Sequence, residues 1–272
     1  MLLQVEPQAN FRIDGPSADV RNREMATKEA IQVAEEIVGI YNDLVVMADL
    51  RPGKEVNSLF SRLVEICVKP RNDKVVDAVL ENKQIKRLAP QLRQICSNAE
   101  AELEGFWANR ILCLYRIVAQ TVLHSFPYYC NYIDLCRLEC STLLSFLPRD
   151  PQSIAFIGSG PLPLTSFCVA DRFPSARIHN IDYDLTAIRV SSALALKLGY
   201  GERMSFSHEM AIGGGSLKPF DVVCLAALVG MDAEEKLQIL ADMARRMKHG
   251  TIICMRSAHS LRALLYPVSL RY

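Results

Sequence analysis

The residues best suited to binding a nucleoside are a glycine turn and the aspartate that follows it. Gly158, Ser159 and Gly160 come directly after the apolar run 153–157, and glycine lets a backbone turn tightly and approach a ligand closely. Asp182 lies 22 residues after Gly160, where the next strand is expected to end. A carboxylate there can accept hydrogen bonds from both ribose hydroxyls. The alternative is a pair of turn glycines beside a solvated aspartate, but the strand–turn–helix context favours a nucleoside site.

The prolines after the glycine turn indicate which nucleoside is bound. A pyrophosphate-binding turn uses a third glycine for close helix packing and aims helix N–H groups at the phosphate. This chain has Pro163 in place of that glycine, and Pro161 removes another N–H donor. S-adenosylmethionine has no phosphate, and its amino-acid tail can lie beside such a turn. The sequence therefore favours S-adenosylmethionine over NAD.

Three glutamates in the first half of the chain could supply a base. Glu100, Glu102 and Glu104 alternate with small and apolar residues. Residues four apart share one face of a helix, so we expect Glu100 and Glu104 to point together and Glu102 to point elsewhere. Glu104 follows Leu103 and precedes two aromatic residues, which predicts partial burial, a raised pKa and the ability to accept a proton from an amine. The alternative is a solvated acidic face.

Tyrosines are concentrated just before another predicted helix. Tyr128, Tyr129 and Tyr132 lie within five positions. Their hydroxyls can line a polar pocket, and their ring faces can attract a sulfonium cation. An aromatic clamp between two domains is the alternative.

Two further polar residues follow the last predicted strand. Arg256 and His259 lie after residues 251–255, and ligands of doubly wound folds bind at the carboxyl ends of the strands. Arg256 could hold a substrate carboxylate, with a surface salt bridge as the alternative. His259 could contact substrate, although a single histidine in such a place is more often structural.

The chain divides into segments that must position these residues. Residues 1–25 are polar and contain prolines, which predicts a flexible tail. In residues 26–148 apolar side chains recur at helical spacing, which predicts a helical domain. In residues 149–272 short apolar runs alternate with helical patterns, which predicts a parallel sheet with helical crossovers. The expected strands are 153–157, 177–181, 204–208, 221–226 and 251–255, with a helix over 233–247.

Composition narrows the classes of partner. Of 272 residues, 50% are hydrophobic and 22% are charged, and the net charge is +1. A chain of this length and composition can bury a core, and its charge gives no field that favours nucleic acid or a membrane surface. No apolar run is long enough for a signal peptide or a transmembrane span. We expect a cytoplasmic protein that acts on a small molecule. The sequence does not decide whether the chain forms a homo-oligomer.

The cysteine pattern indicates free thiols. There are nine cysteines, an odd number, with no CxxC pair. Cys136 and Cys140 are four apart and could share a metal, but no histidine or carboxylate completes a ligand set. Most of the cysteines lie in apolar patterns, so buried thiols in a reducing compartment are expected.

Several long segments resemble the nicotianamine synthase family. The resemblance runs from residue 50 to residue 268, through both predicted domains in order. The segments that carry it are EVNSLF (55–60), residues 96–104, FPYYCNYI (126–133), FIGSGPLPLTS (156–166), residues 201–206, LAALVGM (225–231) and RSAH (256–259).

The resemblance implies an α/β fold, with an N-terminal helical bundle domain capping a Rossmann-like, class I methyltransferase-like parallel sheet. It implies three consecutive condensations of S-adenosylmethionine, each releasing 5′-methylthioadenosine, one of which closes an azetidine ring. The product, nicotianamine, chelates metal ions, and the enzyme itself requires none. Glu104, with Glu100 in reserve, and Tyr128 or Tyr129 are implied as catalytic. The other implied contacts are Gly158, Ser159, Gly160, Asp182, Leu225 and Ala226 to S-adenosylmethionine, and Tyr132, Arg256 and His259 to the acceptor.

Two departures from the family are visible. The third predicted strand ends in Ser207, His208 and Glu209, where the family usually has an aspartate, so either Glu209 substitutes or only backbone contacts the adenine. The chain also ends soon after Val268, where relatives usually continue, which predicts an exposed sheet edge. An S-adenosylmethionine-dependent methyltransferase and a non-catalytic S-adenosylmethionine-binding protein stay as alternatives.

Overall fold

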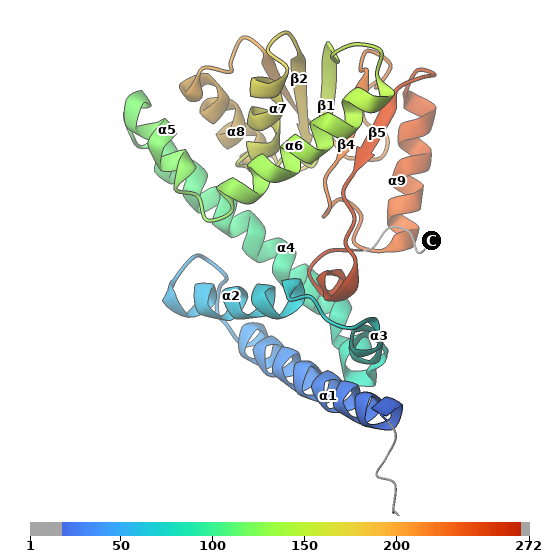
Figure 1. Ribbon diagram of the computed structural model, residues 1–272. Coiled ribbons are helices and arrows are strands. Elements are labelled where there is room, and N and C mark those ends of the chain that lie inside the picture. Colours follow the sequence, from blue (N-terminus) through green and yellow to red (C-terminus); the bar gives the residue numbers. More distant parts are fainter. Residues whose placement is uncertain (1–17, 268–272) are drawn as a thin grey trace, which may run out of the picture.

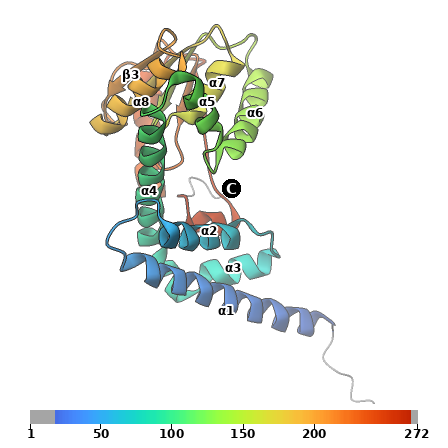
Figure 2. The ribbon, with the colours of Figure 1, turned by 90° about the vertical axis from the view of Figure 1, so that its left-hand side faces the viewer.

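One long helix connects the two parts of the molecule. The computed structural model describes residues 18–267. Helix α4 rises from a layer formed by α1, α2 and α3 into the part that contains the sheet (Figures 1 and 2). The helices of the first part are α1 (Ala18–Val45), α2 (Lys54–Val68), α3 (Asp73–Glu81) and α4 (Lys83–Leu112).

Local sequence sets the limits of these helices. Asn72 and Asn82 cap α3 and α4, because their side chains accept hydrogen bonds from the first free backbone N–H groups. Helix α1 begins at Ala18, so residues 18–25, which we predicted to be part of a flexible tail, are helical. The rest of that predicted tail lies outside the described residues.

The second part contains a parallel five-stranded sheet in the order β3-β2-β1-β4-β5. The central strand β1 pairs with β2 and β4, and its inner residues are buried. Such continuous burial is typical of parallel strands covered on both faces. The α/β fold class is therefore confirmed. The strands are β1 (Ser153–Ile157), β2 (Arg177–Asp182), β3 (Met204–His208), β4 (Val222–Leu225) and β5 (Ile252–Met255).

Helices lie on both faces of the sheet (Figure 1). A short 3-10 helix, η1, returns to the first part and packs on α2, α3 and α4. Ser260, the first residue of η1, has a φ of 58°, which marks the turn by which the chain leaves the sheet. The remaining helices are α5 (Arg116–His124), α6 (Tyr129–Phe146), α7 (Leu164–Arg172), α8 (Leu185–Leu198) and α9 (Ala233–Arg246), and η1 covers Ser260–Leu264.

The hydrophobic cores divide the chain differently from the boundary predicted at residue 148. One core joins the end of α4, α5 and α6 to β1, β2, α7 and α8. A second joins α1, α2, α3 and the start of α4 to Leu261, Leu264 and Leu265. Helix α4 thus belongs to both cores. Because α4 is packed into both cores, it holds the first part of the molecule beside the carboxyl ends of the strands.

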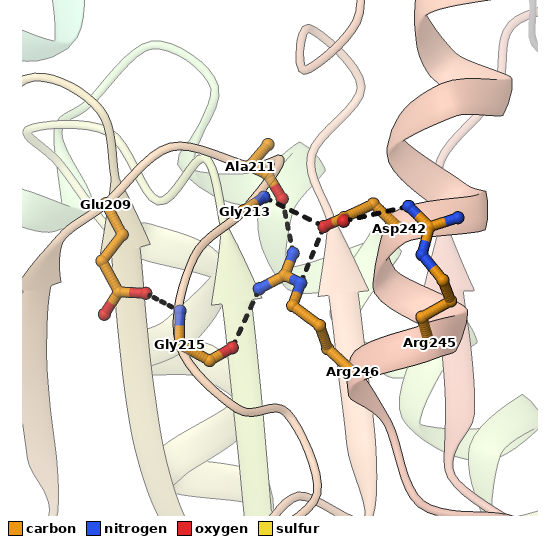
Figure 3. Close-up of polar contacts among 7 residues, drawn as sticks. All are labelled: Glu209, Ala211, Gly213, Gly215, Asp242, Arg245 and Arg246. Carbon is orange, nitrogen blue, oxygen red and sulfur yellow. Dashed lines mark hydrogen bonds and ion pairs between the residues drawn. The ribbon is translucent and has the colours of Figure 1, made fainter.

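The connection from β3 to β4 contains no helix, and side chains hold it in place instead. Glu209 accepts a hydrogen bond from the Gly215 N–H at 2.6 Å. Arg246 of α9 donates to the carbonyl groups of Ala211 and Gly215 and pairs with Asp242 at 2.7 Å. Figure 3 shows these contacts spanning the loop and α9.

At the far side of the sheet, β5 pairs only with β4 among the described residues. It is one of the two edge strands of the sheet as described, and β3 is the other. No helix in residues 18–267 is long and apolar enough to cross a membrane.

Candidate functional site

The glycine turn after β1 is bonded directly to the end of β2. Gly158 and Gly160 have φ values of 80° and 68°, in the left-handed region that favours glycine. The Gly160 N–H donates to Asp182 Oδ2 at 2.8 Å, and the Asp184 N–H donates to Oδ1 at 2.9 Å. Each carboxylate oxygen keeps a second lone pair that a ribose hydroxyl can use.

The turn also contains a polar atom without a partner. Ser159 Oγ is buried and has no hydrogen-bond partner among the described residues. A buried hydroxyl without a partner is uncommon because it loses its hydrogen bonds to water. A ligand atom at the turn would satisfy it.

The loop after β4 packs on the other side of the turn. A Cβ at Gly158 would lie 2.2 Å from Val229 Cγ2 and 3.1 Å from Ala226 Cβ. The Ala226 N–H donates to the Ile157 carbonyl at 3.0 Å, whereas the Leu225 side chain is buried in the core on one face of the sheet. Of the two predicted contacts, Ala226 therefore lies at the turn, and Leu225 is available there through its backbone.

Glu104 reaches the glycine turn from α4. A Cβ at Gly160 would lie 2.6 Å from Glu104 Oε2. The Tyr132 hydroxyl lies 3.4 Å from Oε1, and the Leu162 N–H also bonds the carboxylate. Burial raises the pKa of Glu104 well above its usual range, and the negative charge of Glu100 raises it further. This is the environment expected of a carboxylate that accepts a proton from an amine.

Glu100 lies one helical turn before Glu104 on the same face. Burial raises the pKa of Glu100 to about 7, although the charge of Arg256 and a hydrogen bond with Tyr266 oppose the effect. Glu102 is exposed, and its charge acts on Arg51, whose pKa is raised mainly by Asp49. As the helical spacing predicts, Glu100 and Glu104 share one face of α4 and Glu102 lies on another.

The three tyrosines occupy different environments. Tyr132 is bonded to Glu104. Tyr128 is half-buried and lies near Glu100. Burial raises the Tyr128 pKa most, and the negative charge of Glu100 raises it further. Tyr129 packs beside His124, with ring centroids 4.7 Å apart. The phenol in contact with Glu104 is thus that of Tyr132, for which we predicted substrate binding.

Arg256 connects the end of β5 to α6 and α7. Its guanidinium forms hydrogen bonds with both Glu139 carboxylate oxygens, at 2.6 and 3.0 Å, and with Thr165 Oγ1 at 3.1 Å. The same group lies over the Tyr132 ring, 5.6 Å from its centroid. Arg256 thereby supports Tyr132. His259 is exposed just before η1.

Glu209 is bonded to its own loop rather than to the turn. Its carboxylate accepts from Gly215 N–H, and this bond and one with Ser207 lower the Glu209 pKa. Its backbone N–H donates to the Asp182 carbonyl at 3.0 Å. This geometry favours the backbone alternative for an adenine contact over the side chain of Glu209.

Sequence comparison now identifies the family. The family model described as nicotianamine synthase protein matches residues 26–270. Nicotianamine synthase of Solanum lycopersicum is 39% identical over 239 residues, which cover 87% of this chain and 74% of the relative. Nicotianamine synthase 2 of Arabidopsis thaliana is 36% identical over 239 residues, with the same coverage. This chain belongs to the nicotianamine synthase family.

Solved structures share the fold of this nicotianamine synthase family member. A mutant of MtNAS in complex with S-adenosylmethionine aligns with a TM-score of 0.71 at 24% identity, covering 87% of this chain and 86% of that one. MtNAS in complex with MTA and tNA aligns with a TM-score of 0.70 at 20% identity, covering 94% and 89%. At these identities the likeness establishes the fold, a helical part joined to a Rossmann-like sheet.

The cysteines of this nicotianamine synthase family member are free. We expected most of the thiols to be buried; Cys113 and Cys130 are exposed, and the others are buried or half-buried. Cys136 Sγ and Cys140 Sγ lie 3.6 Å apart. Within residues 18–267 no group of three or more His, Cys, Asp or Glu side chains is arranged to hold a metal ion.

Sequence reasoning missed three residues around the glutamates. Tyr266, Glu139 and Thr165 were not predicted as site residues, yet they bond Glu100 or Arg256. Tyr266 follows η1, and no helical or strand pattern predicts that this segment returns to α4. Glu139 could have been found, because it lies two turns after Tyr132 on the same predicted helix.

Proposed function

We propose that this chain is a nicotianamine synthase, which condenses three S-adenosylmethionine molecules by transferring their aminocarboxypropyl arms. The single observation that carries the proposal is the approach of Glu104 to Gly160. It joins a half-buried carboxylate of raised pKa to a turn suited to a nucleoside. A binding protein that catalyses no transfer needs no proton acceptor beside its nucleoside site.

The nucleoside would be held by the sheet. Both Asp182 oxygens would accept from the ribose hydroxyls while keeping their backbone bonds. Gly158, Ser159 and Gly160 would line the amino-acid side of the ligand, and Ala226 the other side of the turn. The adenine would meet the backbone near Glu209, because the Glu209 side chain is held by Gly215.

The proposed reaction needs positioning and one proton transfer. An amine nitrogen attacks the carbon beside the sulfonium on the aminocarboxypropyl arm, forming a C–N bond. The C–S bond breaks, its electron pair neutralises the sulfur, and 5′-methylthioadenosine leaves. The nitrogen loses its proton to Glu104. The sulfonium already makes this carbon electrophilic, so alignment of the two reactants supplies much of the rate.

The raised pKa of Glu104 fits this role. Without a cation beside it, burial and the charge of Glu100 favour the protonated acid of Glu104. An ammonium group that binds beside it favours the ionised carboxylate, since opposite charges stabilise each other strongly where little water is present. The base would therefore form as the acceptor binds. Tyr132 would orient it through its hydroxyl, with Arg256 holding the Tyr132 ring.

The proposal includes the setting of the reaction. The nine free cysteines fit the reducing cytoplasm. The product would carry carboxylates and amines at chelating spacing, which connects the enzyme to metal homeostasis. The metal would be a ligand of the product. The net charge of +1 fits a small-molecule substrate better than nucleic acid.

Incubation of the purified chain with S-adenosylmethionine alone tests the proposal. Mass spectrometry should find 5′-methylthioadenosine and nicotianamine in a ratio of three to one, the balance of three condensations. S-adenosylhomocysteine would instead identify a methyltransferase. Binding of S-adenosylmethionine without either product would identify a binding protein.

A further inference from the structure

Glu100 and Glu104 form two similar carboxylate–phenol pairs on one face of α4. Tyr132 of α6 bonds Glu104, and Tyr266, which follows η1, bonds Glu100. The two phenols come from distant parts of the chain, and Tyr266 packs with the first part of the molecule. Of the Glu100 and Glu104 carboxylates in the described part of the chain, Glu104 is the one that lies beside the glycine turn. The Glu100 pair is thus set back from the nucleoside by one helical turn.

The surroundings of Glu100 suit a cation. Its carboxylate has no ion-pair partner in the described part of the chain, because the Arg256 guanidinium is bonded to Glu139. Tyr128 and Tyr266 both lie near it. A carboxylate without an ion-pair partner, beside phenol groups, can bind an ammonium group through its charge and through hydrogen bonds.

The spacing of the two pairs matches the repeat of the proposed product. Successive nitrogens along an aminocarboxypropyl chain are separated by three carbons, which is about 5 Å when extended. One turn of an α-helix rises about 5.4 Å. When one nitrogen of the growing chain lies at Glu104, the preceding nitrogen can therefore lie at Glu100.

We propose that Glu100, Tyr266 and Tyr128 form an acceptor subsite that holds the preceding ammonium of the growing chain and so determines how many condensations occur. This inference rests on the proposed function. Glu104 serves the reacting nitrogen in every step, whereas the subsite acts only once the acceptor carries a second nitrogen. Loss of the subsite should therefore release short intermediates.

The test compares Glu100→Gln and Tyr266→Phe with the wild type in the presence of S-adenosylmethionine alone. Mass spectrometry would measure the short condensation intermediates and the complete product. We expect the ratio of short to complete product to rise about tenfold or more, with the later condensations slowed more than the first. Glu102→Gln is the matched control, since Glu102 is exposed on the same helix, and it should keep the wild-type ratio.

A second measurement separates binding from a general loss of structure. Short intermediate collected from Glu100→Gln is supplied to Tyr266→Phe, whose ring is retained, and the KM for this acceptor is expected to rise while the KM for S-adenosylmethionine changes little. An unchanged product ratio in both variants, or equal slowing of all condensations, would overturn the inference while leaving the proposed function intact. If the wild type releases no 5′-methylthioadenosine, the proposed function fails first and the inference fails with it.

Discussion

Gly160 lies so close to the Glu104 carboxylate that a Cβ added at this glycine would stand 2.6 Å from Oε2. The two residues come from different parts of the molecule, since Glu104 is on α4 and Gly160 follows β1. Real Cβ atoms are essentially never found so near an oxygen, so only glycine permits this approach. The glycine therefore does two things at once: it turns the backbone and gives the carboxylate access to the nucleoside side of the site.

Gly160→Ala should abolish this approach. Both the Cβ contact and the φ of 68° oppose alanine, and displacement of a reacting group by about 1 Å can cost about a hundredfold in rate. We expect release of 5′-methylthioadenosine to fall by about that factor. The rate would be measured at saturating S-adenosylmethionine.

Gly250→Ala is the control for backbone strain. Gly250 has a φ of 87°, but a Cβ there would meet nothing within 4 Å. Both variants should lose about 1 kcal/mol of stability from the left-handed backbone, and only Gly160→Ala should lose turnover. Equal activity of the two variants would contradict a role for the close approach.

Glu104→Gln should remove the proton acceptor while keeping the shape of the side chain. General-base catalysis contributes about a hundredfold to ten-thousandfold, so we expect turnover to fall by about a hundredfold or more. S-adenosylmethionine binding, measured by calorimetry, should persist because Asp182 and the turn are unaltered. Glu102→Gln, two residues away and exposed, should keep its turnover; a fully active Glu104→Gln would eliminate Glu104 as the base.

Arg256→Lys should impair the site through Tyr132. Lysine cannot form the two-pronged contact that arginine makes with Glu139, and it would leave Tyr132 without its stacked guanidinium. We expect kcat to fall by about tenfold and the KM for S-adenosylmethionine to change little, because the Arg256 hydrogen bonds go to Glu139 and Thr165 and not to the glycine turn. The melting temperature should also fall, since Glu139 would stay partly buried with a weaker partner.

Arg245→Lys provides the matched control for that substitution. Arg245 also pairs with a carboxylate, Asp242, but its side chain is 70% exposed against 26% for Arg256. Exposed ion pairs contribute little to stability. An equal loss of kcat in both variants would show that the Arg256 effect does not depend on its place beside Tyr132.

The sheet was predictable from sequence because its strands are short apolar runs bounded by turns. The predicted strand 153–157 coincides with β1, and 204–208 coincides with β3. The separation of Glu102 from Glu100 and Glu104 was also predictable, since it follows from helical geometry alone.

The contacts between distant segments were not predictable in the same way. Tyr132 rather than Tyr128 or Tyr129 touches Glu104, because α6 begins at Tyr129 and its first turn directs these side chains to different sides. The Tyr266 contact with Glu100 depends on the return of η1 to α4. We expected the helical domain to end at residue 148 because the apolar periodicity changes there. The hydrophobic cores do not follow this boundary, because α4 contributes residues to both of them.

Glu100 should make stability depend on pH. Burial raises its pKa from 4.5 to about 7, so between these values the folded chain binds more protons than the unfolded chain. Stability from this group is therefore greatest below about pH 4.5 and falls as the pH rises toward 7. Glu100→Gln removes this loss, and it should be more stable than the wild type at pH 8 by about 3 kcal/mol.

Thermal unfolding at pH 5 and pH 8 measures this effect. The melting temperature of Glu100→Gln minus that of the wild type should be about 4 °C more positive at pH 8 than at pH 5. Glu102→Gln, at an exposed position on the same helix, is the matched variant measured at the same two pH values. If the Glu100→Gln and wild-type curves stay parallel between the two pH values, Glu100 is hydrated and ionised throughout. The carboxylate would then lack the buried setting on which its role as a cation subsite depends.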